Sequence, residues 1–304
     1  MDNKLLNFMI SKSDPKEFEK LKDKKDDPEF QKRIKEIREV FDSLYVDETD
    51  LMRKNLTFLK EEKTDLDPEK IETALEQLTD LVERIDNAND FDKLDGITIV
   101  LEYFDHKSSK IRSCAIGVIR ACCQNNPKFQ KLLSEKFPDT LERYIEMLQQ
   151  EEETDQVKSK LISAISSYIL HFPLLQNQFF EMKGLRKLFN LLKKSNAMMQ
   201  SKILFFFISL LLDINAKKLQ NDFWKMKGLF DYIYKLFCQE IIKEEKNEEL
   251  IDKSITFFYL VSKGNKRNCN KFKKLGIKKK LAYLSRIDLF EGIKATAKDF
   301  NKIL

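Results

Sequence analysis

A glycine followed by an apolar residue recurs along the chain at a nearly constant interval. Gly184 and Gly228 are 44 residues apart, Gly96 lies 88 residues before Gly184, and Gly276 follows Gly228 by 48 residues. One further repeat, which lacks its glycine, falls midway between Gly96 and Gly184, near residues 139–141. A period of about 40 to 47 residues is typical of arrays built from units of two or three helices. The sequence therefore predicts a stack of helical repeats.

The unit around Gly184 shows the order of helices within one repeat. Residues 177–183 end a short first helix, and Gly184 is expected to permit the sharp backbone turn after it. Leucines then recur at helical spacing, and residues 199–212 are apolar nearly all round, as in a helix packed between neighbouring repeats. This order, a short helix, then a second helix, then a long buried helix, is that of an armadillo repeat. Matching third helices are expected at 111–123, 157–170 and 251–261.

Composition supports an all-α chain, because only 7 Gly and 6 Pro interrupt 304 residues. We predict an armadillo-like right-handed helical solenoid with about four repeats and flanking capping helices. The expected divisions are a flexible N-terminal segment (1–40), N-terminal capping helices (41–87), armadillo-like repeats (88–265) and C-terminal capping helices (266–304). Asp67 as N-cap and Pro68 in the first turn mark the start of one capping helix.

Residues that would carry chemistry are scarce. The two histidines, His106 and His171, have no His or Cys partner at ligand spacing, so no metal site is expected. There is no glycine-rich phosphate loop, nucleophile elbow or kinase-like motif, which argues against an enzyme and against a bound cofactor. The five cysteines are odd in number and lack disulfide spacing, which favours reduced thiols in the cytoplasm.

The apolar and charged runs limit the partners. The longest strongly apolar run, 203–212, is too short to cross a bilayer, and the N-terminus has no secretion signal, so no membrane association is expected. The basic runs 271–274 and 278–280 are interpreted as a solvated end of the solenoid in preference to a nucleic-acid face. A monomer that binds another protein is the resulting prediction.

Basic residues stand near the start of each expected third helix. They are Arg112, Lys158 with Lys160, Lys202 and Lys253. In an armadillo solenoid the third helices line the concave surface. We therefore expect a ladder of cations along a concave groove that binds the partner. Ordinary solvated charge at helix ends is the alternative interpretation for each residue.

One short motif resembles a known family. Asp86-Asn87-Ala88-Asn89 is similar to the signature of the cytosolic armadillo-type nucleotide exchange factors of 70-kDa heat-shock chaperones, the Fes and heat-shock-binding-protein group. Residues 4–13 resemble that family's opening motif, and residues 50–53 its next helix. Residues 111–115 and Gln124-Asn125-Asn126 resemble its first-repeat third helix. The resemblance spans nearly the whole chain.

The resemblance implies a co-chaperone that binds the ATPase domain of the chaperone through its concave face and accelerates ADP release. In the family the alanine of this motif lies at the chaperone contact, which here is Ala88 between Asn87 and Asn89. A basic residue early in the third repeat's last helix is another family contact, and Lys202 takes that place. A tight helix junction is the alternative interpretation of Ala88.

The family's N-terminal segment also acts as a decoy for the chaperone's client-binding groove. The apolar residues that match it are Leu5, Leu6, Phe8, Met9 and Ile10, flanked by Lys4 and Lys12. The charged segment after Ser13 departs from the glycine-rich linkers of some members, and a small amphipathic helix is the alternative. For the whole chain, the alternative is a general armadillo-repeat adaptor or scaffold, such as a nuclear-import receptor. Those receptors usually line their groove with regular ladders of Trp and Asn, whereas this chain has the single Trp224.

Overall fold

The computed structural model describes residues 47–61, 67–213 and 216–304, together with residues 28, 32 and 35. The chain divides into two compact units, Met1–Leu51 and Met52–Leu304. The apolar residues Leu5, Leu6, Phe8, Met9 and Ile10, expected to mimic a client, lie outside the described residues. The second unit carries the helical repeats.

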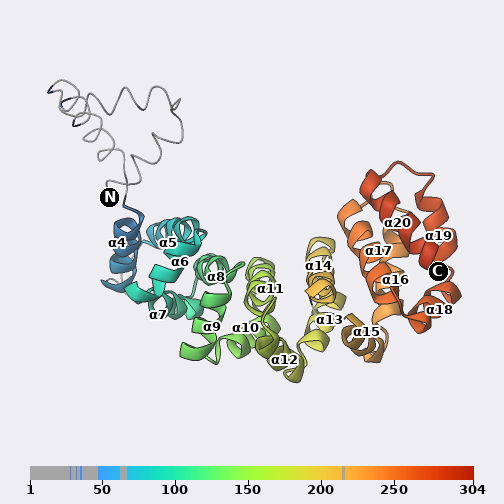
Figure 1. Cartoon of the computed structure of the whole chain (residues 1–304), viewed down its shortest axis with the longest axis horizontal. Helices are drawn as coiled ribbons and strands as arrows, with labels where there is room; N and C mark the ends of the chain where they lie inside the picture. Colours follow the sequence, from blue (N-terminus) through green and yellow to red (C-terminus); the bar gives the residue numbers. More distant parts are fainter. Residues whose placement is uncertain (1–27, 29–31, 33–34, 36–46, 62–66, 214–215) are drawn as a thin grey trace. The chain divides into compact units, whose positions relative to one another are not determined.

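Successive groups of three helices make up most of the described chain (Figure 1). Two helices come first, α4 (Glu48–Glu61) and α5 (Pro68–Val82). The groups are then α6 (Ile85–Phe91), α7 (Gly96–Glu102) and α8 (Ser109–Cys123); α9 (Pro127–Lys136), α10 (Thr140–Gln149) and α11 (Asp155–Ile169); α12 (Pro173–Glu181), α13 (Gly184–Lys194) and α14 (Ala197–Asp213); α15 (Ala216–Lys225), α16 (Leu229–Glu240) and α17 (Glu248–Ser262); and α18 (Lys266–Lys274), α19 (Ile277–Leu284) and α20 (Glu291–Ile303).

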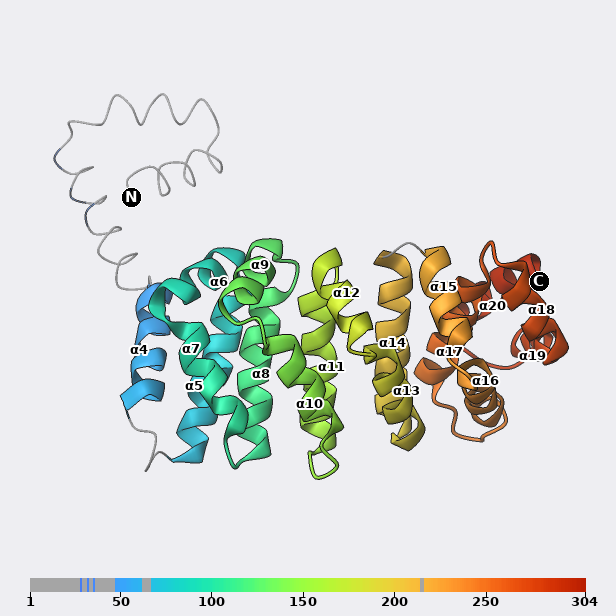
Figure 2. The ribbon, with the colours of Figure 1, turned by 90° about the horizontal axis from the view of Figure 1, so that it is seen from below.

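The last helix of each group packs against the last helix of the next. α5 contacts α8, α8 contacts α11, and the row continues through α14, α17 and α20. Both views show α5, α8, α11 and α14 side by side (Figures 1 and 2). The four third helices expected from the sequence are therefore confirmed as α8, α11, α14 and α17. Residues 266–304, expected to cap the array, contain α18, α19 and α20 in the same order as the preceding groups.

The glycine at the corner before α13 has a different role from the one the sequence suggested. Lys183, not Gly184, takes the left-handed conformation, with φ of 58°. A Cβ atom on Gly184 would overlap the buried ring of Phe179, so the glycine is needed for close packing. The prediction that Gly184 permits the turn was wrong. Gly228 does take a left-handed φ, 86°, and has open space around it.

Buried glutamines join the first helix of a group to the end of its own third helix. Gln130 on α9 donates from Nε2 to the carbonyl oxygens of Ser167 and Leu170 at the end of α11, at 2.7 and 2.9 Å. Gln220 on α15 makes the same pair of bonds to Leu260 and Lys263, at 2.8 and 3.1 Å. The last carbonyls of a helix lack partners within it, so these side chains satisfy them. We call these contacts the glutamine clamps.

The core of the C-terminal groups is built largely from phenylalanine. Phe207, Phe223, Phe257, Phe258 and Phe272 have no exposed surface. Ring centroids lie 5.0 Å apart for Phe207 and Phe223, and 4.7 Å apart for Phe258 and Phe272. Such offset and edge contacts add to the stabilisation that burial alone gives. Among the described helices, none is both long and apolar enough to span a membrane.

Candidate functional site

A groove of about 710 Å³ crosses four neighbouring helices, α5, α8, α11 and α14. Arg120, Lys160 and Lys202 bring one cation each from α8, α11 and α14, whereas α5 contributes the carboxylates of Glu76 and Asp80. Small residues, Ser113 and Gly117 on α8 and Ser159 and Ser163 on α11, form much of its floor. The groove lining has two carboxylates on α5 and three cations on the following helices, together with the carboxylate of Asp155 at the start of α11.

A second hollow of about 530 Å³ continues the groove toward the other end of α8, α11 and α14. Arg120, Ser163 and Lys202 line both hollows, so the two are continuous at these residues. Phe205 lines the second hollow and keeps 53% of its surface exposed, whereas most of the phenylalanines that the structure describes are buried. The combined surface thus joins a basic centre to an exposed aromatic side chain.

The cations at the centre of the groove are not neutralised by the fold. Lys202 donates from Nζ to Oγ of Ser159 at 2.7 Å, and Arg120 donates to the side-chain amide oxygen of Gln124, also at 2.7 Å. Burial, with the charges of Lys160 and Arg120, lowers the pKa of Lys202. Within the described part of the chain, no carboxylate forms an ion pair with any of these three cations.

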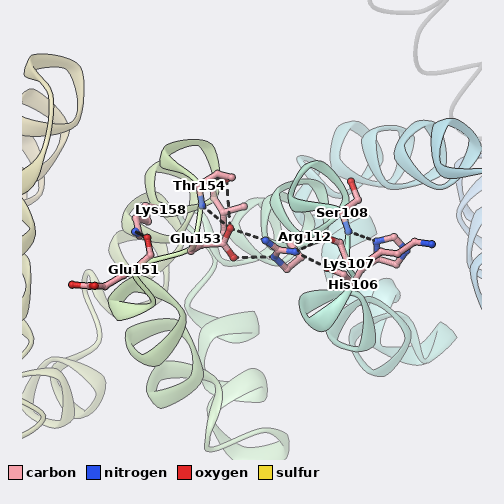
Figure 3. A network of polar contacts seen from close by, with 9 residues as sticks. His106, Lys107, Ser108, Arg112, Glu151, Glu153, Thr154 and Lys158 are labelled. Atoms are coloured by element: carbon pink, nitrogen blue, oxygen red, sulfur yellow. Dashed lines mark hydrogen bonds and ion pairs between the residues drawn. The ribbon is translucent and has the colours of Figure 1, made fainter.

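Arg112, expected in the ladder, is engaged elsewhere. Its guanidinium makes two bonds to Glu153, at 2.7 and 2.9 Å, and donates to the carbonyl oxygens of His106 and Lys107 (Figure 3). The side chain of Glu153 is only 2% exposed. Burial opposes ionisation of Glu153, but bonds from Arg112 and Thr154 outweigh it and hold its pKa below the usual value. Arg112 therefore joins the start of α8 to the turn before α11, outside the groove lining.

Lys158 also lies outside the groove lining. It is half-buried and donates from Nζ to the carbonyl oxygen of Glu151 at 3.4 Å (Figure 3). Lys160, two residues later, is the lysine of α11 that lines the groove. The signal that identifies the groove face is the run of small or basic residues Ser113, Gly117 and Arg120 at one-turn intervals on α8.

Asn87, Ala88 and Asn89 of the resembling motif lie on α6, the first helix of the first group. Ala88 is buried in the core, with 1% of its surface exposed. Asn87 is also buried and donates from Nδ2 to the carbonyl oxygen of Leu81 at 2.8 Å, and Asn89 is half-buried. None of the three lines the groove. The placement of Ala88 matches the tight helix junction that the sequence left open.

No cluster suited to a metal ion occurs among the residues that the structure describes. His106 accepts from the backbone N–H of Ser108, and His171 lies 2.5 Å from a carboxylate oxygen of Asp213. Burial and the charge of Lys107 lower the pKa of His106.

Two protein families match this sequence. The SIL1/FES1/HPBP1 C-terminal domain matches residues 87–228, and the family described as nucleotide exchange factor Fes1 matches residues 3–91. The Hsp70 nucleotide exchange factor FES1 of Kluyveromyces lactis is 25% identical over 76% of this chain and 78% of its own length. The Schizosaccharomyces pombe fes1 protein is 29% identical over 70% and 72%. The nucleotide exchange factor SIL1 of Rattus norvegicus is 28% identical over 54% of this chain, but over 35% of its own length.

Solved structures support the fold. A designed armadillo repeat protein superimposes with a TM-score of 0.64 at 15% identity, over 83% of this chain and 99% of its own. A second, designed for modular peptide recognition, gives a TM-score of 0.62 at 13% identity, over 83% and 99%. The armadillo-like all-α architecture expected from the sequence is thereby confirmed. The two family matches meet at residues 87–91 and together run from residue 3 to residue 228. Over these residues the chain is similar to the SIL1/FES1/HPBP1 family.

Proposed function

We propose that this protein is a co-chaperone that binds the ATPase domain of a cytoplasmic 70-kDa heat-shock chaperone and accelerates the release of ADP from it. Its relatives carry the name of Hsp70 nucleotide exchange factors. The proposal rests on one observation about particular residues. Arg120, Lys160 and Lys202 line the groove, and none of them has a carboxylate partner among the described residues.

The mechanism needs binding energy and no catalytic residue. A factor that binds the open, nucleotide-poor state of the ATPase domain more tightly than the closed state weakens nucleotide binding by the same ratio. ADP then leaves faster and ATP can enter. The protein acts as a monomer in this scheme, because one groove occupies one ATPase domain.

The charges of the groove limit the surface that it can bind. Three cations that repel one another are stabilised by a partner that brings carboxylates to them. The carboxylates of Glu76 and Asp80 on α5 favour basic residues on the same partner. A general armadillo adaptor for basic import peptides is the less favoured alternative, because such a peptide would be repelled by Lys160 and Lys202.

The residues expected at the interface take different roles within this proposal. Lys202 contacts the chaperone directly, and Lys160 and Arg120 extend its contact. Arg112 and Asn87 act by holding the helix junctions, because their side chains bond to other residues of this chain. Ala88 keeps α6 close to its neighbours, and Asn89 and Lys158 border the interface. The apolar segment Leu5, Leu6, Phe8, Met9 and Ile10 assists client release.

The test is a fluorescent-ADP release assay with a purified cytoplasmic Hsp70. The double variant Lys160→Glu/Lys202→Glu places two anions where the partner's carboxylates would lie, so acceleration of release should fall by about 100-fold or more. The control is Lys128→Glu/Arg186→Glu, which changes the net charge equally at two exposed positions outside the groove. It should leave exchange within about twofold of the unaltered protein.

Three outcomes would count against the proposal. Full activity of Lys160→Glu/Lys202→Glu would show that the groove does not bind the chaperone. An equal loss of activity in the control variant would show that the loss comes from the change in net charge alone. Absence of any acceleration by the unaltered chain removes the function itself. Deletion of residues 1–40 provides a separate arm, in which ADP release should persist while release of a bound client peptide slows.

A further inference from the structure

A dense group of cations covers the corner between α18 and α19, outside residues 3–228 that the two families match. Residues 266–286 contain no Asp or Glu. We call the exposed cations of this stretch whose side chains have no partner among the described residues the α18–α19 basic surface; they are Lys266, Lys273, Lys274, Lys278, Lys279 and Arg286. The two helices are adjacent at the C-terminal end of the row (Figures 1 and 2).

Two neighbouring cations have partners within the fold. Lys271 forms an ion pair with Asp231 at 2.6 Å, and the guanidinium of Arg267 stacks on the ring of Trp224, 4.1 Å from its centroid. None of the six residues of the α18–α19 basic surface forms an ion pair with a carboxylate that the structure describes. Their charges are therefore available to a partner.

Helix electrostatics explain only part of this group. Lys273 and Lys274 lie in the last turn of α18, where a cation is stabilised by the helix dipole. Lys278 and Lys279 lie in the first turn of α19, where the same dipole opposes a cation, and that turn has no acidic residue. These two lysines repel the helix end and each other, so the stability of the fold does not account for them.

An exposed aromatic ring lies among these cations. Tyr283 on α19 is 42% exposed, and its ring and hydroxyl have no partner among the described residues. Lys279 precedes it by one helical turn, and Arg286 follows in the next turn, where its backbone N–H donates to the carbonyl oxygen of Tyr283. Cations beside an open aromatic face are the groups that bind single-stranded nucleic acid, through phosphates and base stacking respectively.

We propose that the α18–α19 basic surface binds single-stranded nucleic acid without sequence preference, with Tyr283 stacking on a base and the lysines contacting phosphates. Five of the six cations are lysines, which contact phosphates as point charges, and stacking on an aromatic ring accepts any base, so binding is expected to be largely independent of sequence. The sequence alone favoured a solvated end here, because it did not reveal Tyr283 as exposed and unpartnered beside Lys279.

A bilayer is the less suitable anionic partner. Helices that lie on membranes insert an apolar face beside their basic face. The apolar side chains of α19, Ile277, Leu281 and Leu284, are at most 4% exposed and pack into the protein core. α19 therefore has no apolar face left to insert, whereas nucleic acid requires only the cations and the ring.

The experiment uses the full chain and a fluorescein-labelled single strand of mixed sequence, as RNA and as DNA, with binding followed by anisotropy at several salt concentrations. Lys278→Glu/Lys279→Glu should weaken binding by about 100-fold at low salt and reduce the slope of log K against log salt by at least about 1.4. Tyr283→Ala should weaken binding by about tenfold and leave the slope unchanged. Lys128→Glu/Arg186→Glu, with the same net charge as the lysine variant, should bind within about threefold of the unaltered chain.

The controls distinguish binding at the α18–α19 basic surface from a general effect of net charge. All variants should accelerate ADP release normally, so failure here leaves the proposed exchange function intact and the reverse also holds. Equal losses in the two charge-reversal variants would overturn the proposal. So would undiminished binding by Tyr283→Ala, binding of a duplex as tight as that of the single strand, or binding of phosphatidylserine vesicles without binding of either oligonucleotide.

Discussion

The ammonium nitrogen of Lys202 lies 2.7 Å from the hydroxyl oxygen of Ser159, on the neighbouring helix of the row. A neutral hydroxyl thus holds a cation that burial and two nearby positive charges already disfavour. The pKa of Lys202 is consequently lowered from 10.5, its value in the unfolded chain. Between the two pKa values the unfolded state binds more protons, so the free energy of unfolding rises with pH in that alkaline window.

Removing this charge should therefore stabilise the fold at neutral pH. We expect Lys202→Gln to raise the free energy of unfolding at pH 7 by about 0.5 kcal/mol and to abolish the alkaline rise. Urea unfolding at neutral pH and near pH 10 measures both effects, and Lys128→Gln serves as the exposed control. A lower stability of Lys202→Gln at pH 7 would contradict the description of the groove cations as unneutralised.

Cysteine alkylation should report occupation of the groove. Cys114 lines the groove and is half-buried, whereas Cys238 on α16 is half-buried outside it. Binding of the chaperone should slow alkylation of Cys114 by about tenfold or more and leave Cys238 unchanged. Burial raises the pKa of the Cys114 thiol, so labelling is best followed above neutral pH by mass spectrometry. Equal protection of both thiols would indicate a different binding surface.

The buried ion pair between Arg112 and Glu153 should be among the costliest to break. Arg112→Ala leaves the carboxylate of Glu153, 2% exposed, without its main partner, which should lower the free energy of unfolding by about 3 kcal/mol. Arg112→Ala/Glu153→Ala should cost less than the sum of the single variants, because no buried charge is left alone. Chemical denaturation of the four proteins measures the coupling, and additive losses would argue against the pair.

This ion pair also makes the stability of the fold depend on pH in the acid range. Because the pKa of Glu153 is lowered in the folded state, its contribution to stability is complete above the unfolded value of 4.5 and is lost as pH falls through the folded value. Unfolding of the unaltered protein between about pH 5 and pH 3 should therefore show a loss of stability that Arg112→Ala largely lacks. The difference in slope between the two proteins is the measurement.

Two glycines of the repeat should respond differently to alanine. Gly184→Ala forces a methyl group into the ring of Phe179 and should cost about 2 kcal/mol, part of which Phe179→Leu should restore. Gly228→Ala meets no atom within 4 Å but keeps a φ of 86°, and should cost about 1 kcal/mol with no restoration by any neighbour. Thermal unfolding of the variants tests this, and restoration in both cases would contradict the distinction.

The repeat and its third helices could be predicted because burial follows the helical period and a fixed interval along the chain. Which face of each third helix lines the groove could not be predicted. Lys158 and Lys160 are two residues apart, which turns their side chains by about 200° around the helix axis, so only one of them reaches the groove. Basic residues near a helix start do not tell these directions apart.

Contacts across the repeats were also beyond sequence reasoning. Arg112 finds Glu153 through the packing of α8 against α11, and no local pattern links the two residues. The resemblance to the exchange factors predicted Ala88 as a partner contact, and this stays a prediction; it gave no indication that Ala88 is buried. Its environment depends on how α6 lies against α5 and α8, which is settled only when the helices pack.

The glutamine clamps bear on how such a chain can lengthen. Gln130 and Gln220 each satisfy carbonyls of the same three-helix group to which they belong. A tandem duplication of that group would copy both donor and acceptors together, so the added segment would arrive with its final carbonyls already bonded. Changes in repeat number during evolution therefore require new apolar surfaces to match, but no new partner for these backbone groups.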